Sequence, residues 1–235
     1  GDLPATVTVL SGQAGSGDEG TAMLEIVHDL APGADLFFAT AFGGQASFAQ
    51  NIRDLSAAGC DVIVDDVFYL AEPTFQDGII AQAVNDVTAA GVLYFSSAGN
   101  SGNKNDNTSG VWGGDFAAAT TSPLSVPVHD FGGGVQGNTI TQDSPFFFAL
   151  QWSDAFGASG NDYDLFLMNA ALTTVVAVSN TVQDGNDAPF EAIDSRGVNH
   201  TGLVLVIAQS SGAARYLHLN TNRGRLQINT TGQTS

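Results

Sequence analysis

The sequence predicts a partial parallel α/β domain with flanking helices over residues 1–105, followed by an antiparallel, jelly-roll-like β-sandwich over residues 106–235. Three observations lead to this prediction. Short apolar runs alternate with amphipathic helical patterns in the first half of the chain. A polar, glycine-rich stretch at 101–114 then indicates a linker. Beyond it, short β-type runs recur without a convincing helix, as in sandwiches.

The first half reads as four strands and three helices in alternation. Strands are expected at 5–10, 35–40, 61–65 and 92–97, and helices at 19–30, 45–58 and around 79–87. Gly33, Gly59 and Gly91 each follow a helical pattern, where a left-handed residue ends a helix. Such alternation favours parallel strands, whose ligands lie outside the carboxyl ends of the strands.

The second half contains six runs that we expect to form strands. They are FFFALQW, DYDLFLM, TVVAVS, LVLVIAQ, RYLHLN and RLQIN. Gly, Asn, Asp and Ser separate them, as in the turns between antiparallel strands.

The composition limits the partners of the protein. Asp and Glu total 24 against 6 Lys and Arg, so the net charge is −18. Nucleic acids and anionic membranes require clustered basic residues, so neither is expected as a partner. No apolar run reaches the roughly 18 residues of a membrane span. A single cysteine, Cys60, excludes an internal disulfide and a Cys-based zinc site. Low Lys with many Asp, Asn, Thr and Gly is typical of extracellular bacterial proteins.

Two loops after predicted strands carry candidate catalytic residues. Glu19 stands at the start of the first helix. One interpretation is that its negative charge complements the helix dipole, and the other is that it is a catalytic carboxylate. Asn100 follows the fourth strand and either belongs to an ordinary turn or donates to an oxyanion. Asp65 and Asp66 end the third strand and point to opposite faces, so we expect one of them to bond a loop backbone.

The candidate metal ligands lie in the second half. Asn161, Asp162 and Asp164 supply oxygen atoms at a density that suits calcium, whereas the alternative is a solvated acidic loop. An organic cofactor is not expected, because no GxGxxG motif follows the first strand and no Walker sequence occurs.

Two segments resemble subtilisin-like serine peptidases. Residues 17–41 (GDEGTAMLEIVHDLAPGADLFFATA) are similar to the segment around the catalytic histidine of that family, in which His-Gly-Thr opens a helix followed by Ala-Pro and a strand. Residues 92–100 (VLYFSSAGN) are similar to the strand that ends in the oxyanion-hole asparagine. The resemblance implies a peptidase acting on peptides or proteins, with Asn100 as the oxyanion donor.

The chain also departs from that family. Glu19 stands where the histidine is expected. A glutamate there is similar to the sedolisin branch, but the aspartate expected one turn later is replaced by Met23, and sedolisins have aspartate where this chain has Asn100. The Gly-Thr-Ser of the nucleophile does not occur. We therefore expect a fragment that is inactive by itself.

The second half resembles the pre-peptidase C-terminal and P-like β-sandwich modules of secreted bacterial peptidases, chiefly through Asp-x-Asp-Leu-x-Leu at 162–167. The resemblance implies an insertion in a secreted peptidase, and such modules can bind calcium. The alternative is a non-catalytic surface protein whose β-sandwich binds protein or glycan.

Overall fold

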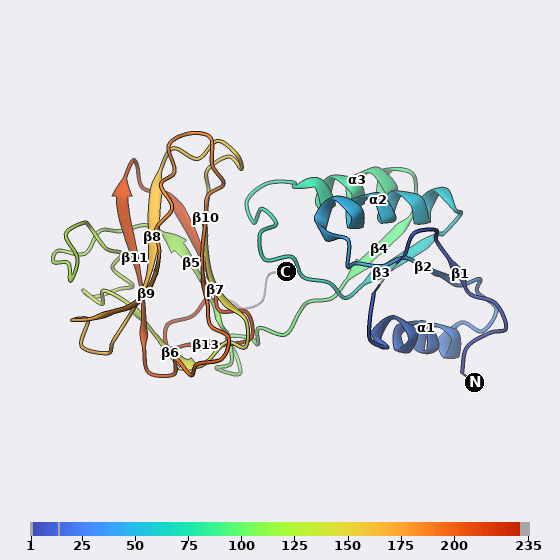
Figure 1. The fold of residues 1–235 in the computed structure, drawn as a ribbon, viewed down its shortest axis with the longest axis horizontal. Coiled ribbons are helices and arrows are strands. Elements are labelled where there is room, and N and C mark those ends of the chain that lie inside the picture. Colours follow the sequence, from blue (N-terminus) through green and yellow to red (C-terminus); the bar gives the residue numbers. More distant parts are fainter. Residues whose placement is uncertain (1, 14, 231–235) are drawn as a thin grey trace. The chain divides into compact units, whose positions relative to one another are not determined.

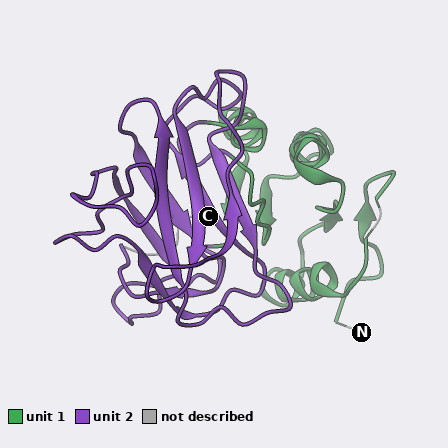
Figure 2. Cartoon of the chain, turned by 60° about the vertical axis from the view of Figure 1, so that its left-hand side comes forward, with its two compact units in different colours: residues 1–72, 77–97 green, residues 73–76, 98–235 purple. Residues whose placement is uncertain are grey.

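The computed structural model describes residues 2–13 and 15–230. It divides into two compact units (Figure 2). Unit 1 comprises Gly1–Glu72 and Asp77–Ser97, and unit 2 comprises Pro73–Gln76 and Ala98–Ser235. No helix in the described part of the chain is long and apolar enough to cross a membrane.

Unit 1 alternates strands and helices, as its apolar periodicity predicts. Its elements are β1 (Thr8–Val9), α1 (Glu19–Leu30), β2 (Phe37–Phe38), α2 (Gly44–Ala57), β3 (Val62–Asp65), α3 (Ile79–Ala89) and β4 (Leu93–Ser96). Gly59 and Gly91 follow α2 and α3 with φ of 100° and 99°, which confirms two of the three predicted glycine helix ends. Gly33 lacks a positive φ, so the third was wrong, and α1 ends before Ala31 and Pro32 instead.

The strands of unit 1 pair in parallel but do not form the single sheet that we expected. β1 pairs with β2, and β3 pairs with β4, so the described residues form two separate two-stranded sheets. β2 is regular for only two residues. Just beyond it, the Thr40 N–H donates to the Gln13 side chain at 2.5 Å. A side chain thus takes the place of a strand partner at this point.

Helices lie on both sides of these strands (Figure 1). α2 and α3 cover one face, where a small core forms from Ala49, Ile52, Ile63, Ile80, Ala83, Val87 and Val92. α1 lies on the opposite side, and a Cβ atom at its Gly20 would meet the Phe38 ring of β2 at 2.5 Å. No residue of α1 is fully buried, so this helix covers little of that face.

Unit 2 is a sandwich of two antiparallel sheets. One has the strand order β10-β7-β12-β5 and the other β13-β6-β11-β8-β9. The strands are β5 (Val111–Asp115), β6 (Asn138–Gln142), β7 (Phe147–Trp152), β8 (Asp162–Met168), β9 (Val175–Ser179), β10 (Phe190–Asp194), β11 (Val204–Ser211), β12 (Tyr216–Asn220) and β13 (Arg225–Leu226).

All six predicted runs contain strands, but three strands were missed. β5 and β6 carry Gly, Asn or Thr among few apolar residues, and β10 places two acidic residues among three apolar ones, so the alternating pattern is weak in all three strands. The prediction of a linker over 101–114 was wrong for its last residues, because Val111 and Trp112 are buried in β5. Pairing with β12 holds β5 in the sheet despite its two glycines.

The core of unit 2 is large and aromatic. Trp152, Phe148 and Tyr163 are fully buried between the sheets, together with aliphatic residues from seven strands. The short segment Pro73–Gln76 joins this unit. Phe75 packs edge-on against Tyr216 at 5.9 Å, and the Thr74 N–H donates to the Gln151 side chain at 2.9 Å.

His129 is a buried histidine of unit 2 within an aromatic cage of Trp112, Phe116 and Phe131. Its Nδ1 accepts the Ala117 N–H at 3.1 Å, so the neutral ring carries its proton on Nε2. Burial lowers the pKa of His129 to about 4, although Asp130 acts in the opposite direction. The cage therefore favours neutral imidazole.

Replacing His129 by Asn should flatten the acid dependence of stability. The folded pKa is below the ordinary value of 6.5, so the unfolded chain binds a proton first as the pH falls. The contribution of neutral His129 to the unfolding free energy is fully present above about pH 6.5. It is lost as the pH falls toward 4, by at most about 3 kcal/mol. Urea unfolding at pH 7.5 and at pH 4.5 measures this loss. If the unfolding free energy falls by the same amount between these two pH values in the wild type and in His129→Asn, the lowered pKa of His129 is wrong.

Candidate functional site

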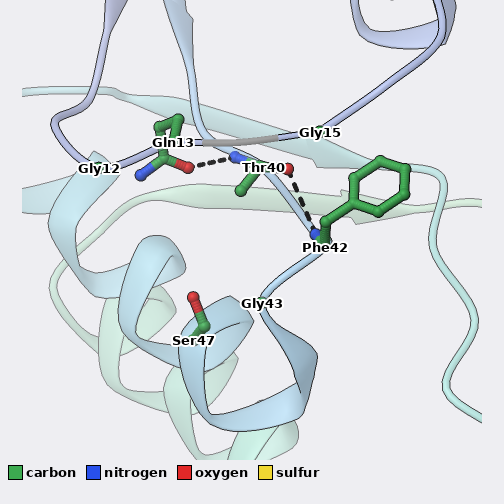
Figure 3. A pocket seen from close by; sticks show the side chains of 7 residues that line it. All are labelled: Gly12, Gln13, Gly15, Thr40, Phe42, Gly43 and Ser47. Carbon is green, nitrogen blue, oxygen red and sulfur yellow. Dashed lines mark hydrogen bonds between the residues drawn. The ribbon is translucent and has the colours of Figure 1, made fainter.

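The carboxyl ends of β1 and β2 border a pocket in unit 1, at the edge where parallel strands present ligand sites. Its volume is about 190 Å³. Figure 3 shows the residues that line it: Gly12, Gln13, Gly15, Thr40, Phe42, Gly43 and Ser47. Small-molecule sites usually measure about 300–1,000 Å³, so this pocket is the size of one amino-acid side chain. Its lining combines a phenyl ring with an amide and two hydroxyl groups.

A buried polar network fixes this edge. The Gln13 Oε1 accepts the Thr40 N–H at 2.5 Å and Asn51 Nδ2 at 3.3 Å, while Asn51 Nδ2 also donates to the Thr40 carbonyl at 2.7 Å. The loop after β1 is thereby tied to β2 and α2. Sequence reasoning missed Asn51, although an amide three residues after Phe48 on the apolar face of the predicted helix was a usable signal.

Glu19 is the first residue of α1, as predicted, and its side chain is exposed. It does not line the pocket. It therefore lies where a negative charge can complement the helix dipole. Both interpretations of Glu19, charge complementation and catalysis, stay predictions.

Asn100 lies four residues after β4 in an exposed bend. Gly99 before it has a φ of 72°, which favours glycine there. Asn100 belongs to unit 2, whereas Glu19 belongs to unit 1. A crevice shared by these two residues therefore stays a prediction.

Asp65 ends β3 and is held by its neighbours. It accepts hydrogen bonds from the Tyr94 hydroxyl, from Ser96 Oγ at 2.8 Å and from the Val67 N–H at 3.3 Å. The last bond confirms the predicted contact with a loop backbone. Burial and the Asp65 charge raise the pKa of Tyr94, so its hydroxyl remains a donor. Asp65 thus joins the ends of β3 and β4.

The predicted calcium ligands divide between two clusters in unit 2. Asn161 belongs to the first cluster, in which its Nδ2 donates to the Asp154 carboxylate at 2.8 Å and its Oδ1 accepts the Ala213 N–H at 2.6 Å. Arg215 Nε also donates to Asp154, at 2.5 Å. Burial would raise the pKa of Asp154, but hydrogen bonds led by that of Arg215 outweigh it and lower the pKa.

The second cluster contains Asp162, Asp164 and Glu191, which are all buried. Asp164 accepts the Ser210 hydroxyl at 2.5 Å, and Glu191 accepts Gln183 Nε2 at 2.9 Å. Burial raises the pKa of Asp164 and of Glu191, and neighbouring carboxylates add to it. A raised pKa means that the protonated carboxyl group stabilises the folded protein. This contribution to the unfolding free energy is fully present below the ordinary carboxyl pKa values and is lost as the pH rises through the pKa values of the folded protein.

The fit of this cluster to a cation is incomplete. Gln183 Oε1 is buried and lacks a hydrogen-bond partner among the described residues, so one oxygen is free for a ligand. Within the same described ranges, however, no three His, Cys, Asp and Glu side chains form a group that could hold a metal ion. Calcium binding therefore stays a prediction.

Comparison with known proteins gives little further guidance. No family model matches the sequence, and no curated protein matches it. Among solved structures, the chain is similar to the CspB protease of Clostridium perfringens, with a TM-score of 0.45 and 10% sequence identity. The match covers 83% of this chain and 45% of that one, so the chain spans less than half of its length.

Proposed function

We propose that this chain is part of a secreted, subtilisin-like serine endopeptidase that hydrolyses peptide bonds by acyl transfer. A serine outside these residues attacks the scissile carbonyl, and Asn100 Nδ2 donates to the oxyanion. Glu19 orients or replaces the usual base. By itself the chain lacks the complete catalytic set and does not cleave peptides.

The observation that carries this proposal is the position of the two family-like segments. The segment 17–41 forms α1 followed by β2, with Glu19 as the first helical residue. The segment 92–100 forms β4, parallel to β3, and ends in a glycine turn at Asn100. Both residues follow strands of parallel pairs, as the resemblance requires.

The test compares the 235-residue chain with the longer protein from which we propose it derives. The longer protein should cleave a casein substrate and be inactivated by a serine-directed sulfonyl fluoride, whereas the chain alone should be inactive. Inhibitor-sensitive cleavage by the chain alone would contradict the proposal. A longer protein that is folded but inactive would favour the alternative, a non-catalytic surface protein whose β-sandwich binds protein or glycan.

We further propose that the sandwich binds calcium at Asp162 and Asp164, with Asn161 next to them. Two observations support this. Both aspartates are buried without a basic partner among the described residues, and Gln183 Oε1 is available nearby. Oxygen atoms of this kind are what calcium prefers. The same carboxylates would otherwise repel each other.

Calcium should raise the melting temperature of the sandwich relative to protein in chelator. At a hundredfold excess over Kd, the gain is about 2.7 kcal/mol. Asp164→Asn should abolish the shift, whereas Asp184→Asn, which alters an exposed acid of a neighbouring loop, should retain it. The same melting temperature with calcium and with chelator would contradict the proposed site.

A further inference from the structure

The turn at 221–224, which we call the clamp turn, follows β12 and is held in a conformation that its residues rarely adopt. Asn222 and Arg223 have φ of 45° and 77°, in the left-handed region that bulky side chains avoid. The Asn222 N–H donates to Asn220 Oδ1 at 2.7 Å, and the Asn222 carbonyl accepts Ser144 Oγ at 3.1 Å. Strained backbone of this kind persists only where its surroundings hold it, and it is common at functional sites.

The clamp turn binds the loop after β4 at two points. The Arg223 N–H donates to Ser101 Oγ at 3.3 Å. Thr221 donates from both its N–H and its Oγ1 to the Gly110 carbonyl, at 2.9 Å each, and the Gly110 N–H donates to the Ser101 carbonyl at 3.0 Å. The buried Ser101 is therefore fixed through its side chain directly, and through its carbonyl by way of Gly110.

Glycine at position 110 permits this close approach. A Cβ atom at Gly110 would overlap Thr221 Oγ1 and the Gly224 carbonyl oxygen. A larger residue there would push the clamp turn away from the loop. The loop and the clamp turn both belong to unit 2, so this contact lies within one compact unit.

Ser101 immediately follows Asn100, whose side chain we propose as the oxyanion donor. Asn100 lies in an exposed bend after Gly99, so it has little packing of its own to hold it. An oxyanion donor lowers the barrier only if it is held near the position of the developing charge. Fixing both the hydroxyl and the carbonyl of the next residue restricts the backbone that carries Asn100.

We propose that Ser101 is a positioning residue for Asn100, and that the sandwich supplies the clamp turn that holds Ser101. This inference rests on the proposed peptidase function. It gives the sandwich a part in catalysis, because the turn after β12 determines how the oxyanion donor is oriented. The clamp uses the backbone N–H of Arg223, whereas the guanidinium of this residue lies over the Phe146 ring.

The test measures kcat and KM in the longer peptidase. Ser101→Ala removes the acceptor of the Arg223 N–H and should lower kcat about tenfold, a part of the 10²–10³ that a whole oxyanion donor contributes, with KM unchanged. In the Asn100→Leu background the same substitution should change kcat by less than about twofold, because the donor that Ser101 positions is then absent. Ser122→Ala is the matched control. Ser122 Oγ also accepts a backbone N–H, that of Leu124 at 3.0 Å, in an exposed loop of the same unit, and kcat should stay within about twofold.

The outcomes separate this inference from the proposed function. If Asn100→Leu lowers kcat but Ser101→Ala does not, the positioning role is wrong and the peptidase function stands. An equal fall of kcat for Ser101→Ala in both backgrounds would indicate a general structural effect and would also refute the positioning role. If the longer protein is inactive, or if Asn100→Leu leaves its kcat unchanged, the proposed function fails and this inference fails with it.

Amide hydrogen exchange on the 235-residue chain tests the clamp turn without any activity. The Arg223 amide should exchange at least about tenfold faster in Ser101→Ala than in the wild type, because its acceptor is removed. Its exchange should be unchanged in Ser122→Ala. Equal exchange in the wild type and in Ser101→Ala would show that the clamp turn does not hold Ser101, and this result would overturn the inference whatever the activity of the longer protein.

Discussion

Trp152→Ala is expected to lower the unfolding free energy of the sandwich by about 3–5 kcal/mol, the usual cost of removing a large buried aromatic side chain. Trp152 is fully buried on β7 and packs against Tyr163 at a ring distance of 5.3 Å. Its Nε1 donates to Ser159 Oγ at 3.0 Å. The substitution therefore opens a cavity and leaves the buried Ser159 hydroxyl without the indole N–H that donates to it.

This loss is large because Trp152 connects the core to the polar cluster beside it. Ser159 Oγ also donates to Asp154 at 2.9 Å, and Asp154 holds Arg215. Loss of the indole thus loosens one end of the sandwich as well as its core. A single domain often has only 5–15 kcal/mol of stability, so the variant should be close to unfolding at 37 °C.

Urea unfolding monitored by circular dichroism measures this effect. Phe156→Ala is the matched control, since Phe156 is 41% exposed in a nearby loop, and it should cost well under 1 kcal/mol. If Trp152→Ala and Phe156→Ala unfold at the same urea concentration, the buried position of Trp152 is wrong.

Asn100→Leu, made in the longer peptidase, should lower kcat by a factor of about 10²–10³. Leucine has a similar size but cannot donate to the oxyanion. Because this hydrogen bond forms mainly in the transition state, kcat should fall while KM changes little. The corresponding loss of transition-state stabilisation is about 2.7–4 kcal/mol.

The neighbouring loop provides a control for this experiment. Asn105 is exposed five residues further along, and Asn105→Leu should leave kcat within twofold. Thermal melting of both variants separates catalysis from folding. A normal kcat in Asn100→Leu would remove Asn100 from the oxyanion site and with it the main link to subtilisin-like chemistry.

Much of the fold could be predicted because its signals are local. The spacing of Met23, Ile26, Val27 and Leu30 predicted α1 with its observed bounds. Six apolar runs predicted six strands of the sandwich. β5 was missed because its two glycines interrupt the hydrophobic alternation that identifies a strand. Its pairing with β12 holds this segment in the sheet.

The candidate sites were less accessible to such reasoning. The pocket lies in loops that follow β1 and β2, but neither Glu19 nor Asn100 lines it. Gln13, Thr40 and Asn51, which fix this edge, act through contacts between distant segments. Asn161, Asp162 and Asp164 are close in sequence, yet Asn161 bonds Asp154 while Asp164 bonds Ser210. Successive side chains of a strand point to opposite faces of the sheet, so residues that are adjacent in sequence can belong to different clusters.

The sequence by itself determined the helices, most strands, the acidic surface and the order of the elements, because periodicity and composition act over a few residues. Only the tertiary structure decided that the parallel strands form two separate pairs and that His129 is enclosed by aromatic rings. It also brought the clamp turn of the sandwich against Ser101. These features depend on which segments meet in space, and pairing and burial between distant residues leave no local pattern in the chain.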